Sequence, residues 1–366
     1  MDEIRIGFIG AGYVNFGGGE GPWDHASRLE RLEGVRIVGV SDPCRERAQA
    51  VLAGRTSPAF EGAQAYATPR ELLEQGRPDV VWIGVPPNAH GTLETSRDLE
   101  LACAKAGVHL FIEKPLSNAE PEAVRPLCNA LQQSNVLVSV GYMFRYSRAI
   151  DKMKELLAEC GEFARVFVGR YNCAYSEIRK TEWWDVRQSG GPIVEQATHF
   201  VDLARYLVGE AVLSTVHAQR IMAGDLGGDL SDVPADADGN PYDAQVPDRF
   251  KAPRATAATW TFENGAIASL THGTWLHRKK YESSIEVWAD GLMMVLEDPY
   301  GDCRLIVRRP HSEESETFAF SNDDPYLSED RAFIEAIRRN TPSLIRSPYD
   351  DAFKTFELTW AIRRAK

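Results

Sequence analysis

The sequence predicts an α/β protein with an N-terminal Rossmann-type, doubly wound parallel sheet. A C-terminal α+β domain with a large, mostly antiparallel open sheet is expected to follow. Three observations predict this class: Val- and Ile-rich runs alternate with amphipathic stretches, a glycine-rich turn follows the first run, and strand patterns separated by short turns fill much of the second half. Strands that alternate with helices indicate a parallel sheet covered on both faces, whereas strands in direct succession indicate an antiparallel one.

The length of 366 residues, at roughly 150 residues per domain, indicates about two domains. We expect one domain over residues 1–125 and a second over residues 126–366. The sixth strand of the first sheet, 136–140, would then lie near the boundary.

In the first domain we predict strands from short runs rich in Val and Ile, with helical patterns between them. The predicted strands are 4–9, 35–40, 80–85, 109–112 and 136–140, and the helical patterns include 93–106 and 120–133. In the second domain the predicted strands are 164–171, 256–262, 266–274, 283–289, 293–296 and 303–308. The helical patterns at 192–208, 330–339 and 348–364 are expected to cover one face of this second sheet.

Residues 224–254 are rich in Asp, Gly and Pro, and we predict a long solvated loop or lid there. The pattern Asp236-x-Asp238-x-Asn240 hints at a calcium loop. However, Pro241 stands where such loops need glycine. We therefore predict no metal site.

Charge and composition exclude several partners. Lys and Arg number 41 against 53 Asp and Glu, so the net charge of −12 disfavours a nucleic acid or an anionic membrane. No apolar run approaches the ~18 residues of a membrane span, and the N-terminal residues are too acidic and too few for a secretory signal. The six cysteines form no Cys-x-x-Cys pair, as expected of reduced, buried thiols. We expect a cytoplasmic location.

A glycine-rich turn, Gly7-Phe8-Ile9-Gly10-Ala11-Gly12, directly follows the first predicted strand. Glycine permits a tight turn and a close approach of the backbone to a pyrophosphate, which would lie at the start of the next helix. An ordinary strand–helix turn is the alternative. Asn15 stands where the third glycine of the fingerprint is expected, and residues 16–23 form a loop insertion before a helix that begins near Asp24. The predicted cofactor-binding residues of this turn are Gly10, Gly12, Tyr13 and Val14.

Asp42 follows the second predicted strand. A carboxylate at this place accepts hydrogen bonds from the adenosine ribose and repels a 2′-phosphate, so it favours NAD over NADP. Arg45 and Arg47 lie nearby in the sequence and leave NADP possible. The same residue could also cap the following helix.

Two further turns follow predicted strands, Pro86-Pro87-Asn88-Ala89-His90 and Glu113-Lys114-Pro115. Ligands bind doubly wound sheets at the carboxyl ends of their strands. Together with the glycine turn, these stretches resemble the glucose-fructose oxidoreductase / inositol dehydrogenase / rhizopine catabolism (Gfo/Idh/MocA) family, over nearly the whole chain. The resemblance implies that Lys114 lies beside the nicotinamide and the reacting hydroxyl. The cofactor-binding residues expected around it are Pro86, Asn88, His90 and Glu113.

The helical pattern after Pro192 places Glu195, His199 and Asp202 on one face, opposite an apolar face. By itself this pattern is also compatible with a solvated polar face, and zinc is disfavoured because no third ligand is evident. The resemblance implies an acid and a histidine four residues apart that both point at substrate, here Glu195 and His199. The division of the base role between Lys114 and His199 stays open.

We also predict substrate contacts from Tyr142, Arg145 and Trp184, with core packing as the competing interpretation for the tryptophan. The expected function is hydride transfer between NAD(P) and a secondary alcohol or ketone of a sugar, cyclitol or related polyhydroxy compound, by a homodimer or homotetramer. The domain over residues 1–125 would then bind NAD(P), and the domain over residues 126–366 would bind substrate and mediate oligomerisation. Two alternatives are an NAD-dependent glycosidase on the same fold and a non-catalytic dinucleotide sensor.

Overall fold

The computed structural model describes residues 3–18 and 23–365, which form two compact units. The first unit comprises Met1–Tyr146 and Asp324–Phe353, and the second comprises Ser147–Asp323 and Lys354–Lys366. The predicted loop insertion 16–23 therefore lies in part, at residues 19–22, outside the described residues.

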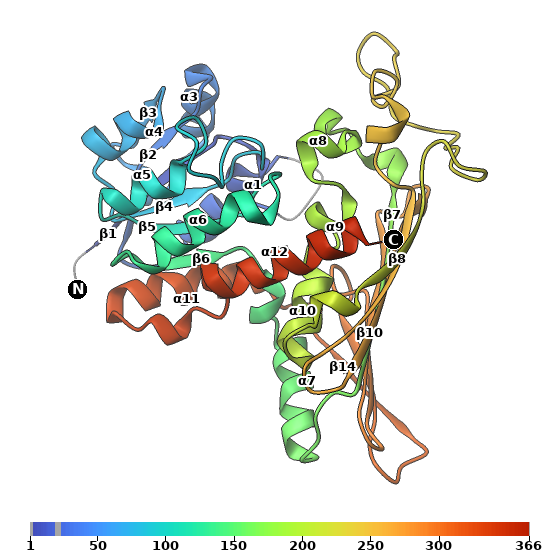
Figure 1. The fold of residues 1–366 in the computed structure, drawn as a ribbon. Coiled ribbons are helices and arrows are strands. Elements are labelled where there is room, and N and C mark those ends of the chain that lie inside the picture. Colours follow the sequence, from blue (N-terminus) through green and yellow to red (C-terminus); the bar gives the residue numbers. More distant parts are fainter. Residues whose placement is uncertain (1–2, 19–22, 366) are drawn as a thin grey trace. The chain divides into compact units, whose positions relative to one another are not determined.

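The first unit is built on a six-stranded parallel sheet in the order β3-β2-β1-β4-β5-β6 (Figure 1). This is the strand order of a dinucleotide-binding sheet, with its switch point between β1 and β4. The strands are β1 (Ile4–Ile9), β2 (Val35–Ser41), β3 (Gln64–Tyr66), β4 (Val80–Ile83), β5 (His109–Ile112) and β6 (Val138–Val140). The predicted strands and the Rossmann-type class are confirmed. Only β3, which has three residues, has no counterpart among the predicted strands.

The helices of the first unit are α1 (Tyr13–Phe16), α2 (His25–Leu29), α3 (Arg45–Ala53), α4 (Pro69–Glu71), α5 (Leu99–Lys105), α6 (Pro121–Gln132) and α11 (Pro325–Arg339). Helix α2 starts where predicted, because the Asp24 side chain accepts a hydrogen bond from the amide of Ser27. Helix α5 is shorter than the pattern 93–106. The preceding residues form a turn in which Arg97 donates to the carbonyls of Pro87 and His90.

The prediction that the pattern 330–339 covers the second sheet is wrong. Helix α11 packs in the first unit, where Phe333 and Ile334 join the core around Trp82 and Phe111. The rings of Trp82 and Phe111 stack at 5.3 Å. An amphipathic pattern shows that a helix buries one face, but it does not show which sheet that face meets. Helix α12 (Tyr349–Arg364) contributes its residues up to Phe353 to the first unit and the remainder to the second.

The second unit contains an eight-stranded sheet in the order β14-β13-β12-β11-β7-β10-β9-β8. All neighbours are antiparallel except β7 and β10. The strands are β7 (Val166–Ala174), β8 (His217–Ile221), β9 (Ala255–Thr261), β10 (Ile267–Leu276), β11 (Tyr281–Trp288), β12 (Met293–Glu297), β13 (Arg304–Arg308) and β14 (Ser315–Ala319). The predicted mostly antiparallel sheet is thus confirmed. The two edge strands, β8 and β14, have no predicted counterpart because they are polar and largely exposed, as edge strands often are.

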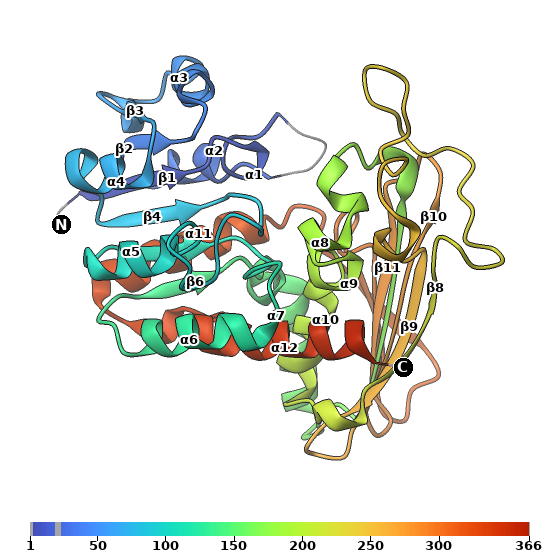
Figure 2. The same cartoon turned by 45° about the horizontal axis from the view of Figure 1, so that its top comes forward.

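Helices cover one face of this sheet. The helices are α7 (Arg148–Glu159), α8 (Val186–Ser189), α9 (Pro192–Glu195) and α10 (Thr198–Val208). Figures 1 and 2 show α7 and α10 on the same side of the sheet, and no described helix of this unit lies on the other side. The continuous helix predicted over 192–208 is two helices, because the amides of both Gln196 and Ala197 donate to the carbonyl of Pro192 and break the register.

Residues 224–254 form the predicted loop, with only a 3₁₀ turn at Asp248–Phe250. The loop is anchored rather than freely solvated. The buried Arg254 guanidinium lies 3.0 Å from the Asp243 carboxylate and donates to the carbonyl of Gly228 at 3.1 Å. The amide of Asp232 donates to the Tyr175 hydroxyl at 2.9 Å. Among the described residues, no helix combines the length and the apolarity that crossing a bilayer requires.

Candidate active site

The glycine turn after β1 has two glycines with different constraints. Gly10 has φ +96°, and a Cβ atom there would lie 2.6 Å from the carbonyl oxygen of Gly84. Gly12 has φ −84°, and the nearest atom to a Cβ there is that same oxygen at 4.0 Å. Gly10 is therefore required by the turn itself. The turn itself does not require glycine at position 12, and the contact of Gly12 with a pyrophosphate stays a prediction.

Asn15 takes the place of the missing third glycine. Its side chain is fully buried, and its amide group donates to the carbonyls of Ile9 at 3.3 Å and Gly10 at 2.8 Å. A Cβ atom on Gly84 would lie 2.6 Å from this amide group, so Gly84 leaves room for it. Asn15 thus holds the turn through hydrogen bonds, whereas the third glycine of the usual dinucleotide-binding fingerprint allows the helix to pack closely on the strand.

Asp42 ties the glycine turn to the start of α3. Its carboxylate accepts hydrogen bonds from the amides of Ala11 and Cys44, both at 2.9 Å, and lies 3.2 Å from the guanidinium of Arg47. The prediction that Asp42 caps the following helix is wrong, because α3 starts at Arg45 and its N-cap residue is Cys44, whose amide the Asp42 carboxylate binds. Each carboxylate oxygen has more than one lone pair, so a ribose hydroxyl can still be accepted. These residues at the carboxyl ends of β1 and β2 suit a dinucleotide.

The other predicted cofactor residues lie in α1, which follows the glycine turn, and in the loop that follows β4. Tyr13 is 61% exposed, Val14 is half-buried, and Pro86 and Asn88 are exposed after β4. His90 is buried, and its Nδ1 lies 2.6 Å from the buried Glu100 carboxylate. His90 therefore has a structural partner, and its contact with the cofactor stays a prediction.

Lys114 follows β5 and is half-buried. The preceding Glu113 points its carboxylate at His25, 2.8 Å from Nε2, and the other ring nitrogen of His25 lies 2.8 Å from the carboxylate of Asp330. Sequence reasoning missed His25 and Asp330. They lie 305 residues apart, and no local pattern connects them.

Tyr142 and Arg145 are both buried in the first unit. The Arg145 guanidinium forms an ion pair with Asp351 at 2.5 Å and donates to the carbonyl of Arg346 at 2.6 Å. It also lies over the Tyr142 ring. These contacts hold the start of α12 against the 3₁₀ turn Met143–Tyr146. Substrate contact by either residue stays a prediction.

In the second unit, Glu195 ends α9 and His199 lies in the first turn of α10. His199 and Asp202 are buried, so the alternative of a solvated polar face is wrong for them. Asp202 accepts a hydrogen bond from the Thr355 hydroxyl at 2.9 Å and has a structural role.

A cluster of aromatic side chains lies near Glu195 and His199, and sequence reasoning missed it. The Tyr300 ring lies 6.4 Å from the His199 ring and 5.0 Å from the ring of Tyr281. Tyr171 contacts both tyrosines, and burial raises its pKa, with further contributions from neighbours that include Glu195. The only sequence signal was the alternation along β7, which puts Tyr171 on the covered face.

His272 on β10 completes the cluster. Its Nε2 lies 3.1 Å from the side-chain oxygen of Gln196, and its ring stacks on Tyr171. Burial lowers the pKa of His272 to about 4, so the ring is neutral near pH 7. A neutral imidazole donates one hydrogen bond, here to Gln196, the residue after Glu195.

Trp184 lies in a buried cluster with Trp183, Tyr175 and Ala252. Its indole N–H donates to the carbonyl of Ile178 at 3.1 Å. The loop 224–254 packs on this cluster through Leu230, Val233 and Tyr242. Core packing therefore accounts for Trp184, and substrate contact stays a prediction.

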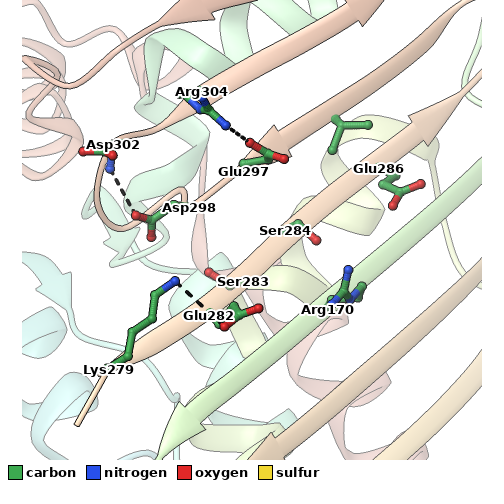
Figure 3. A pocket seen from close by; sticks show the side chains of 11 residues that line it. Arg170, Lys279, Glu282, Ser283, Ser284, Glu286, Glu297, Asp298, Asp302 and Arg304 are labelled. Carbon is green, nitrogen blue, oxygen red and sulfur yellow. Dashed lines mark hydrogen bonds and ion pairs between the residues drawn. The ribbon is translucent and has the colours of Figure 1, made fainter. Parts of the chain in front are cut away.

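The opposite, uncovered face of the second sheet carries a charged pocket (Figure 3). Its lining includes Arg170, Glu282, Glu286, Glu297 and Arg304, and Glu297 pairs with Arg304. Neither Glu195 nor His199 lines this pocket. It is thus separate from the predicted substrate residues.

Comparison with known proteins identifies both parts of the chain. Residues 4–142 match the family described as "Oxidoreductase family, NAD-binding Rossmann fold", and residues 145–292 match an oxidoreductase C-terminal domain. An uncharacterised protein of Schizosaccharomyces pombe is 36% identical, covering 99% of this chain and 91% of that protein. The myo-inositol 2-dehydrogenase of Thermotoga maritima is 26% identical, covering 93% and 90%. A levoglucosan dehydrogenase, solved with NADH and levoglucosan, has the same fold, with a TM-score of 0.77 at 18% identity, covering 100% of this chain and 97% of that one.

Proposed function

The chain belongs to the Gfo/Idh/MocA oxidoreductase family with an NAD(P)-binding Rossmann fold, and from this premise we propose that it is a dehydrogenase or reductase acting on a polyhydroxy compound. Hydride would pass between the nicotinamide and a secondary alcohol or ketone of a sugar, cyclitol or related molecule. The names of the Thermotoga maritima myo-inositol 2-dehydrogenase and of the levoglucosan dehydrogenase give inositol and levoglucosan as their substrates, which supports this substrate class. They lend no support to a glycosidase or a dinucleotide sensor.

The observation that carries the proposal is the surroundings of Glu195 and His199. An acid and an imidazole stand beside tyrosine rings on the covered face of the second sheet. Aromatic faces pack on the C–H surface of sugar rings, and carboxylate and imidazole groups bind hydroxyls. This combination suits a polyhydroxy ring better than an apolar or a strongly anionic ligand.

The residues then divide the chemical work. NAD(P), when bound, supplies or accepts the hydride. Gly10 and Gly12 would admit its pyrophosphate, and Asp42 would accept its ribose hydroxyls, which favours NAD over NADP. Lys114 or His199 would take the proton that the substrate hydroxyl loses, since a positioned base contributes typically about 10²–10⁴-fold. Glu195 would orient the imidazole or accept a substrate hydroxyl.

We also propose a homo-oligomer assembled through the uncovered sheet face. This face lacks a covering helix among the described residues and carries both acidic and basic side chains around the charged pocket (Figure 3). Mixed charges allow two copies of one surface to complement each other. Sedimentation at several concentrations tests this proposal, and a monomer at all of them would contradict it.

The function is tested with a panel of cyclitols, pyranoses and ketoses, offered with NAD and with NADP, while absorbance at the nicotinamide band is followed. We expect net reduction or oxidation of the cofactor with at least one polyol or ketose, and faster turnover with NAD. Hydrolysis of a glycoside without net NADH would favour the glycosidase. Binding of NAD without turnover on the whole panel would favour the sensor.

A further inference from the structure

Three charged side chains form a buried network in the first unit, and the proposed reaction does not account for it. His25 is only 2% exposed and lies between two carboxylates, with Nδ1 2.8 Å from Asp330 and Nε2 2.8 Å from Glu113. Asp330 is fully buried and also accepts a hydrogen bond from the indole N–H of Trp82 at 3.2 Å. The network joins α2, α11 and the turn after β5.

The geometry favours a protonated His25. A neutral imidazole has one N–H group, so one of the two carboxylates would face a lone pair. Burial by itself lowers the pKa of His25, but attraction and hydrogen bonds from Asp330 and Glu113 outweigh burial and raise it to about 10. Arg28 on the same helix also attracts the Asp330 carboxylate, and its guanidinium pairs with Asp324 at 2.9 Å. Burial raises the pKa of the Asp330 carboxyl, and His25 offsets part of that rise. With both carboxylates ionised, the three groups together carry one negative charge.

The network holds the residue that precedes Lys114. The Glu113 amide donates to the carbonyl of Ile83 at 3.0 Å, and its carboxylate packs against Gly141, where a Cβ atom would lie 2.8 Å from Oε1. His25 provides the third point of attachment. Glu113 is thus held by its backbone, by packing and by a charged hydrogen bond, and the chain leaves it directly into Lys114.

We propose that His25 is a positioning residue for Lys114. It fixes the Glu113 side chain, and its positive charge offsets the carboxylate of this residue, which directly precedes Lys114 in the chain. This proposal rests on the proposed function in one respect, that Lys114 is the group that exchanges a proton with substrate. Asp330 acts behind His25, since it keeps the ring oriented and charged.

The test uses charge changes that preserve hydrogen bonding. H25Q removes the cation, E113Q removes the neighbouring carboxylate, and H25Q/E113Q removes both. The first readout is the reactivity of Lys114 toward trace acetic anhydride across pH in protein without cofactor, measured by peptide mass spectrometry. Lys279, which is 62% exposed in the second unit, is the matched control in the same samples. The second readout is the pH profile of hydride transfer.

We expect the midpoint of Lys114 labelling to rise by about one pH unit in H25Q, because this variant removes a positive charge near the amine. The midpoint should fall by a similar amount in E113Q, because this variant removes a negative charge. The double variant should return close to wild type, and Lys279 should not move. A role limited to packing would lower activity and leave the midpoints unchanged, and that result would overturn the proposal. If H25Q does not fold, an unchanged midpoint in E113Q overturns it equally.

The two proposals fail separately. If wild-type protein transfers no hydride on the panel but Lys114 labelling shifts as expected, the proposed function falls and the network stands. If hydride transfer occurs with the same pH profile in all variants and labelling does not shift, His25 is not a positioning residue.

Discussion

The two glycines of the β1 turn offer a matched pair of substitutions, Gly10→Ala and Gly12→Ala. In Gly10→Ala, a residue with a side chain must adopt φ +96°, which costs roughly 1–3 kcal/mol. Its Cβ would lie 2.6 Å from the Gly84 oxygen. The Gly84 residue cannot move freely, since its amide donates to Ile9 at 2.9 Å. Overpacking of this kind adds about 1–3 kcal/mol. We expect the free energy of unfolding to fall by about 2–6 kcal/mol in total.

Gly12→Ala should behave in the opposite way. Its φ of −84° is ordinary for alanine, and the nearest atom lies 4.0 Å from the new Cβ. Stability should stay within about 1 kcal/mol of wild type, whereas NADH affinity should drop by at least about tenfold because the methyl group occupies the approach of the pyrophosphate. Denaturant unfolding and calorimetric titration with NADH measure the two effects. Equal stability of both variants, or unchanged NADH affinity in Gly12→Ala, would refute this division of roles.

Three further predictions concern other residues of the two units. Lys114→Ala and His199→Ala should each lower hydride transfer by roughly 10²–10⁴-fold; the variant whose pH profile loses its ascending limb identifies the base, and two unchanged profiles would remove both residues from the mechanism. The pKa of His25 is raised to about 10, so its stabilising contribution is complete below pH 6.5 and is lost as pH rises toward 10, whereas the pKa of His272 is lowered to about 4, so stability falls as pH drops from 6.5 toward 4. Unfolding measured across pH should therefore show the alkaline loss weaken in H25Q and the acid loss weaken in His272→Gln; a pH dependence identical to wild type in both would contradict the assignments. Trp184→Phe removes a buried indole that donates to Ile178, and we expect about 1–3 kcal/mol of destabilisation with little change in the KM for substrate; a large rise in KM with unchanged stability would instead make Trp184 a substrate residue.

The part of the site that follows strands of the first sheet was predictable from sequence. A glycine turn after a first strand, an aspartate after the second and Glu-Lys-Pro after the fifth all lie within a few residues of the strand that positions them. Local chain geometry therefore carries the signal. The helical pattern also predicted that Glu195 and His199 lie in helical segments close together in the chain, whereas their contact with substrate stays a prediction.

The partners of these residues were not predictable. His25 finds Asp330 across 305 residues, and Tyr300 meets His199 from a turn between β12 and β13. Arginine and tryptophan are residue types that suit a sugar pocket. In the structure, however, Arg145 pairs with Asp351 and Trp184 packs under the loop 224–254. A side chain's chemistry shows what it can bind, whereas its partner depends on which elements the fold brings together.

The sequence alone determined the two sheet classes, the strands that hydrophobic periodicity marks, and the chemistry at the strand ends, because those features depend on neighbours a few residues away. Only the tertiary structure decided that α11 returns to the first unit and that a buried imidazolium supports the residue before Lys114. Those outcomes depend on contacts between segments distant in the chain, whose free energies no local pattern records.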